Sequence, residues 1–136
     1  MSESQQPDAP DLAPDVRELA SKAFDLAREG DAATLTEYVD AGVPADIVNE
    51  SGDSLVMLAA YHGHLEAVRL LLERGADPNQ ANDKGQTPLA GAVFKGGVEI
   101  IQALLAHGAD PAAGSPSAVD AAAMFGKLDL LELFRG

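Results

Sequence analysis

Small and apolar residues recur along the chain at the spacing of an amphipathic helix. The first such stripe consists of Leu19, Ala20, Ala23, Leu26 and Ala27. Residues three and four apart share one face of a helix, so this stripe predicts a helix from about Val16 to Gly30. Similar stripes return further along, each followed by a glycine. The pattern therefore predicts short helices joined by tight turns and loops.

Glycines in two series share one period of 33 residues. The first series is Gly30, Gly63 and Gly96, and the second is Gly42, Gly75 and Gly108. Glycine adopts the left-handed backbone conformation at the least cost, so the first series is expected to break one helix of each period and the second to end the next helix. Each period is predicted to contain a helix, a tight turn, a second helix and a loop.

Sequence segments within these periods carry a family resemblance. Residues 83–89 read Asp-Lys-Gly-Gln-Thr-Pro-Leu, residues 58–64 read Leu-Ala-Ala-Tyr-His-Gly-His, and Gly-Ala-Asp occurs at 75–77 and at 108–110. With the period, these segments resemble the ankyrin repeat over residues 17–134. The resemblance implies an all-α ankyrin-repeat solenoid of about four stacked helix-turn-helix units, in which two full repeats are flanked by degenerate caps.

The predicted organisation is a flexible acidic tail over residues 1–15 and a repeat domain over residues 16–136, with units at about 16–48, 49–81, 82–114 and 115–136. Asp25 stands in the first unit where the second has Leu58, as expected of a terminal layer with a solvated face. The last unit is short, because Gly126 follows Gly96 by only 30 residues. These units are interpreted as the two caps.

Residues expected to start the first helix of each unit are Ser54, Thr87 and Ser117, with Ser21 at the matching offset in the first unit. Pro88 follows Thr87, where a helix tolerates proline. The histidine that the family has after Thr-Pro-Leu is replaced by Met57, Ala90 and Asp120. The hydrogen bonds of that histidine are therefore expected to be absent.

Catalytic and metal-binding patterns are weak. The chain has no Cys and three histidines, His62, His64 and His107; the resemblance assigns His64 a structural role at the start of a second helix. Carboxylate pairs such as Asp129 and Glu132 are interpreted as solvated surface, and no Gly-rich phosphate loop or nucleophile motif occurs. We expect no catalysis, no metal and no cofactor.

The net charge of -13 narrows the class of partner. Thirteen of the 22 acidic residues, but three of the nine basic residues, lie at or before Asp53. This charge disfavours nucleic acid and favours a protein partner with a basic surface. The acidic, proline-containing start differs from a secretory signal and no long apolar run occurs, so a cytoplasmic location away from membranes is expected.

Binding positions are implied by the resemblance, because such stacks expose the ends of the first helices and the loop fingers on a concave face. Seven positions after the predicted caps the four units carry Arg28, Tyr61, Phe94 and Met124, and the aromatic and apolar residues among them suggest an interface. The alternative is that these side chains fill gaps between neighbouring repeats. The helix-end candidates are Tyr61, His62, Phe94, Lys95, Met124 and Phe125, and the finger candidates are Glu50, Asp53, Asp83, Lys84 and Gln86.

The function predicted from these observations is a protein-protein interaction module, an adaptor or a regulator, that binds a partner through its concave face and fingers. A monomer is favoured over a homo-oligomer. One alternative is a structural or self-associating role for the last unit, through Leu130, Leu133 and Phe134. A small-molecule or metal binder is the third possibility, although a short open solenoid seldom provides a closed pocket.

Overall fold

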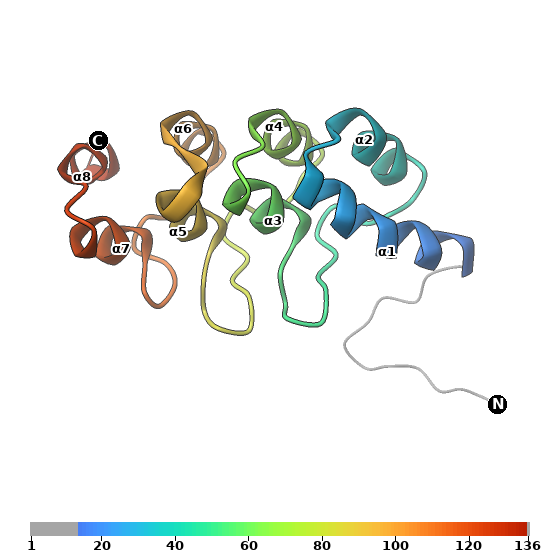
Figure 1. Cartoon of the computed structure of the whole chain (residues 1–136), viewed down its shortest axis with the longest axis horizontal. Coiled ribbons are helices and arrows are strands. Elements are labelled where there is room, and N and C mark those ends of the chain that lie inside the picture. The colour runs from blue at the N-terminus through green and yellow to red at the C-terminus, as the bar shows by residue number, and fades with distance from the viewer. Residues whose placement is uncertain (1–13, 136) are drawn as a thin grey trace.

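A computed structural model describes residues 14–135 of the chain, and these residues form a row of stacked helix pairs (Figure 1). The first helix of each pair lies in one row and the second helix in another, with the long loops projecting below the first row. The elements are α1 (Pro14–Glu29), α2 (Ala32–Asp40), α3 (Leu55–Tyr61), α4 (Leu65–Glu73), α5 (Pro88–Gly91), the π-helical turn η1 (Ala92–Gly96), α6 (Val98–Ala106), α7 (Ala118–Met124) and α8 (Leu128–Arg135).

The predicted all-α repeat architecture is confirmed. Within the described residues, the only extended pairings are two isolated bridges, Val48 with Ser54 and Gly114 with Ser117. The predicted tail falls mostly on residues 1–13, which lie outside the described part of the chain.

Small side chains let neighbouring layers approach closely. Alanines of α1, α3 and α7 are fully buried, among them Ala23, Ala59 and Ala121. The second helices add larger residues to the same core, including Leu71 and Leu104, which are also buried. Layers shield their apolar sides on one another, so the core extends along the stack.

In three of the four repeats, a side chain caps the N-terminus of the first helix, as the sequence predicted. The hydroxyl oxygen of Ser54 accepts from the Met57 amide at 3.0 Å, and that of Thr87 accepts from the Ala90 amide at 3.2 Å. Ser117 accepts from the Asp120 amide, while Asp120 accepts from the Ser117 amide at 3.4 Å. Asp120, at the family's histidine position, therefore completes a reciprocal cap that the sequence reasoning missed.

The first repeat departs from the prediction. Ser21 does not begin a helix, because α1 starts at Pro14 and runs through Ser21 without a break. The predicted start near Val16 was two residues late.

The third repeat also departs from the prediction, at the glycine that ends its first helix. Gly30, Gly63 and Gly126 have positive φ after the first helix, but in the third repeat this conformation occurs at Gly97, with φ 91° and ψ 167°, and not at Gly96. Gly96 instead lies inside η1. The two consecutive glycines let the helix widen by a π turn before it ends.

Hydrogen bonds between loops repeat from one layer to the next on the side of the second helices. The carboxylate of Asp46 accepts from the Asp77 amide at 2.7 Å, and one period later the amide oxygen of Asn79 accepts from the Asp110 amide at 2.7 Å. At the same end of the layers, Arg74 donates to both carboxylate oxygens of Asp40, at 2.9 and 3.3 Å.

Candidate protein-binding face

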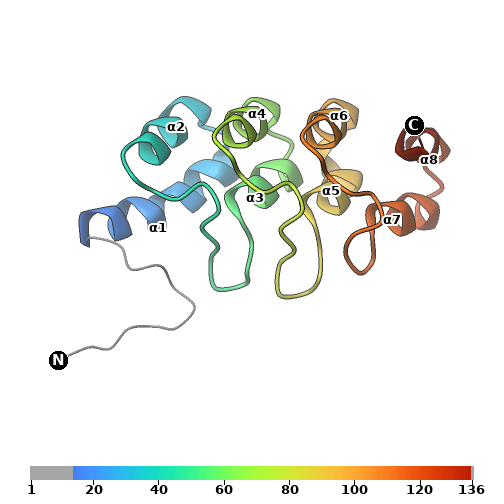
Figure 2. The same cartoon turned by 180° about the vertical axis from the view of Figure 1, so that it is seen from behind.

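The two long loops form fingers of the same internal design, which Figure 2 shows side by side from behind. In finger 1 (residues 48–54), the side-chain oxygen of Asn49 accepts from the amides of Ser51 and Asp53. In finger 2 (residues 81–87), Asn82 does the same for Lys84 and Gln86. Asparagine favours this turn because its side chain can replace a backbone acceptor.

The fingers are also tied to each other. The Asn82 side-chain amide donates to the Asp53 carboxylate at 2.8 Å, and the Asp83 backbone amide donates to the Ser51 carbonyl at 3.0 Å. Gly52 lies so close to Asp83 that a Cβ atom on it would come within 2.8 Å of the Asp83 backbone nitrogen. The fingers therefore present their side chains in a fixed register.

A groove of about 550 Å³ lies between the fingers and α3. It brings together the five finger residues predicted from the sequence with Tyr61, and adds Met57 and Leu58, which the sequence reasoning did not select. Its lining residues are Glu50, Ser51, Asp53, Met57, Leu58, Tyr61, Asn82, Asp83, Lys84 and Gln86.

Met57 lines the groove and also lies against Gly91 of the next repeat, which has no side chain to displace it. A Cβ atom at Gly91 would lie 3.1 Å from the Met57 methyl carbon, so a larger residue there would crowd the methionine. Gly91 stands one period after Leu58. A signal existed in the sequence, since a glycine replaces a leucine inside a predicted helix, but its neighbour in space could not be read from one chain.

The helix-end candidates form a second feature, a strip along the second, third and fourth repeats. In it, the ring at the end of one first helix contacts a side chain at the end of the next first helix. The ammonium of Lys95 lies 5.6 Å from the centroid of the Tyr61 ring, and the rings of Phe94 and Phe125 meet edge to face with centroids 5.0 Å apart. Tyr61 and Phe94 are 37% and 40% exposed, and Met124 is 69% exposed. The rings both contact their neighbours and face solvent.

The neighbouring histidines play different parts. His62 is exposed and meets the Tyr61 ring edge to face. Nε2 of His64 instead donates to the Arg28 carbonyl at 2.7 Å, which joins the second repeat to the first. His64 therefore has the structural place that the sequence analysis gave it. We call the finger groove and the helix-end strip together the finger face.

Charge is distributed unevenly over the finger face. The carboxylates of Glu50, Asp53 and Asp83 form no ion pair with any residue in the range 14–135. The ion pair of Asp40 and Arg74 lies elsewhere, at the ends of α2 and α4. Its hydrogen bonds, donated by Arg74, lower the pKa of Asp40 and raise the pKa of Arg74.

Two features are absent from residues 14–135. No three His, Cys, Asp or Glu side chains there lie close enough together to hold a metal ion. No helix there is long and apolar enough to cross a membrane.

Comparison with known proteins adds the following similarities. A family model described as ankyrin repeats in three copies matches residues 23–115. A Pseudomonas aeruginosa protein, whose name places it among ankyrin repeat proteins, is 45% identical over 61 residues, which is 45% of this chain and 36% of that protein. Human ankyrin repeat domain-containing protein 29 is 44% identical over 62 residues, which is 45% of this chain and 21% of that protein. The matched segment thus spans well under half of these relatives.

Proposed function

This chain belongs to the ankyrin-repeat family, whose repeats are generally protein-protein interaction modules, and we propose that its finger face binds another protein. The observation that carries the proposal is the joining of a polar groove to a strip of exposed rings. The chain has two Tyr and four Phe, and three of these six rings lie in the strip. Aromatic residues with a polar rim are typical of the centre of an interface.

The proposed role is that of an adaptor or a regulator in the cytoplasm, acting as a monomer and without catalysis or a cofactor. Proteins of this family are typically non-enzymatic binding modules. The net charge of -13 supports a partner with a basic surface and argues against nucleic acid. Because opposite charges would steer such a partner, its affinity is expected to fall as salt is added.

The test begins with affinity capture on the full chain, identification of a captured protein by mass spectrometry and its purification. Calorimetry then compares the wild-type chain with Tyr61→Ala and Phe94→Ala. Each substitution is expected to weaken binding about 30-fold, as truncation of a central aromatic does. Gln102→Ala, at an exposed position of the second-helix row, is the matched control and should bind normally.

The result that would overturn the proposal is normal binding by both aromatic variants, with circular dichroism showing that both remain folded. Light scattering on the same samples addresses self-association. A stable dimer that dissociates when Met124 is changed to Ser would favour the self-associating role instead, since Met124 is the most exposed of the apolar residues in the strip.

A further inference from the structure

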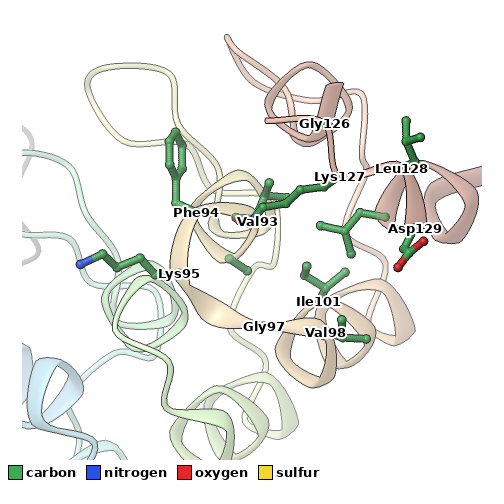
Figure 3. Close-up of a pocket in the computed structure, with 12 residues that line it drawn as sticks. Val93, Phe94, Lys95, Gly97, Val98, Ile101, Gly126, Lys127, Leu128 and Asp129 are labelled. Atoms are coloured by element: carbon green, nitrogen blue, oxygen red, sulfur yellow. Dashed lines mark hydrogen bonds between the residues drawn. The ribbon is translucent and has the colours of Figure 1, made fainter. Parts of the chain in front are cut away.

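The finger face continues at its C-terminal end into a second groove, of about 610 Å³, between α6 and α8 (Figure 3). Val93, Ile101 and Leu130 of its lining are buried, whereas Val98 and Leu128 are 51% and 69% exposed. Figure 3 shows Val98 and Ile101 across the groove from Leu128 and Asp129. The groove therefore has an apolar floor and apolar rims that meet solvent.

The groove exists because the last repeat is set apart from the third. The second helices of neighbouring repeats pack together from α2 to α4 and from α4 to α6, but α6 and α8 barely meet. The last repeat follows a loop three residues shorter than the others. Gly97 contributes no side chain there, and the Lys127 ammonium, which could have filled the space, donates to the Val93 carbonyl at 2.6 Å.

Phe94 joins this groove to the helix-end strip, because it lines the groove and contacts Phe125. The exposed apolar side chains at this end of the molecule thus form one surface, which we call the apolar end. It consists of Phe94, Val98, Met124, Phe125 and Leu128.

The finger groove has acidic character. Glu50 and Asp83 are exposed at the two finger tips, and neither has an ion-pair partner in residues 14–135. The finger groove has three carboxylates, of Glu50, Asp53 and Asp83, against the one ammonium of Lys84, whereas Lys95 and Lys127 face only Asp129 in the lining of the second groove. A cation of a partner is therefore favoured at the fingers and disfavoured at the second groove.

We propose that the finger face takes an extended partner segment with a Lys or Arg at the finger tips and an apolar side chain at the apolar end, in the groove between α6 and α8. This inference rests on the proposed function. Adjacent packed helices lie about 8–10 Å apart, so α3 and α7, two layers apart, are separated by roughly 16–20 Å. The segment must also pass from the fingers, which project below the first-helix row, to the second-helix row, so at least about five or six extended residues are needed between the two side chains.

The test is selection of phage-displayed random peptides, about twelve residues long so that they can cover this span, on the full chain. We expect the selected peptides to share a Lys or Arg at least about five residues from a Leu, Ile, Met or aromatic residue. One selected peptide is then synthesised and its affinity measured by calorimetry.

Two pairs of substitutions test the two ends. Glu50→Lys with Asp83→Lys should weaken the peptide about tenfold, and a peptide with Glu in place of its cation should regain affinity for this variant. Val98→Ser with Leu128→Ser should also weaken it about tenfold. Glu37→Lys with Glu66→Lys, at exposed positions of α2 and α4, is the charge-matched control and should bind as the wild type does.

The outcomes separate this inference from the proposed function. The inference is overturned, and the proposed function is left standing, in two cases. In the first, the peptides bind the Phe94→Ala variant weakly but show no preference for a cation. In the second, they bind the Phe94→Ala variant weakly but bind the variants at both ends as tightly as the wild type. Peptides that also bind the Tyr61→Ala and Phe94→Ala variants as tightly as the wild type contradict both the inference and the proposed function. Failure of the library to yield any peptide specific for the wild-type chain also overturns the inference.

Discussion

His64 and Lys127 occupy the same position in the second and fourth repeats, just before the second helix. Each donates to a backbone carbonyl at the end of the first helix of the preceding repeat, His64 to Arg28 and Lys127 to Val93. These carbonyls lack a helical partner because they belong to the last turn. A single side chain thereby both satisfies a helix end and joins two layers.

Replacing His64 with Ala is expected to lower the free energy of unfolding by about 1 kcal/mol, since the Arg28 carbonyl loses its donor. Urea denaturation followed by circular dichroism measures the change. His62→Ala is the control, because His62 is exposed and has no hydrogen bond of this kind. Equal stability of the two variants would show that the bond to Arg28 contributes nothing.

The ion pair of Asp40 and Arg74 makes a pH-dependent contribution. The hydrogen bond from Arg74 lowers the pKa of Asp40 in the folded chain, so the contribution is present above the ordinary pKa of aspartate and is lost as the pH falls through the lowered value. NMR titration of the Asp40 carboxyl carbon should show this lowered pKa, and Arg74→Gln should raise it. An Asp40 pKa that is the same in both chains would contradict the assignment.

At the scale of elements, the sequence predicted the helices whose ends are set by residues close by in the chain. The caps at Ser54, Thr87 and Ser117 follow from short-range chemistry, and the 33-residue period fixed the order of helices and loops. The π turn could not be predicted, because the 33-residue period selects Gly96, whereas the positive φ falls on Gly97 and this shift depends on how η1 packs. The stripe from Val16 to Gly30 predicted α1 to within two residues, whereas the repeat period, which put the start at Ser21, did not, because the extra turns have no counterpart in the other repeats.

Gly97 is the position where an element depends on glycine itself. Its φ of 91° and ψ of 167° fall in a region that is essentially restricted to glycine. Gly97→Ala should therefore destabilise the chain by about 1–3 kcal/mol, although nothing lies within 4 Å of the position of the new Cβ atom. Thermal unfolding measures the loss.

Gly97→Asn is expected to give no relief, because asparagine tolerates the left-handed helical region and not this one. The wild-type chain is the reference in both cases. An asparagine variant as stable as the wild type would mean that the chain shifts the turn back to Gly96.

At the scale of the whole molecule, the candidate binding face was predicted in part. The period places Tyr61 and Phe94 on one strip and brings the finger residues together, and the offset of seven from the cap Ser117 adds Met124. The groove between α6 and α8 was not foreseen, although the short spacing to Gly126 was visible, because the sequence does not tell how far a shortened loop displaces a helix pair. Met57 was hidden for the same reason, since its space depends on Gly91 in another layer.

Stability along the stack is expected to be uneven, because each repeat is supported only by its neighbours. The last repeat has one neighbour, and α8 packs mainly on α7, with Leu130 its one buried residue among those described. Amide hydrogen exchange should therefore be faster in α8 than in α4 or α6, through opening of the last repeat alone. Equal protection of the three helices would indicate that the chain unfolds only as a unit.

The bonds between the fingers also limit how this chain could be re-engineered. Finger 2 is tied to finger 1 through Asn82 and Asp83, and to the following loop by the bond from the Ser115 amide to the Gly85 carbonyl. A single loop transplanted from another scaffold would leave donors and acceptors unmatched on both sides. Grafting of a new specificity should therefore exchange these loops as a set.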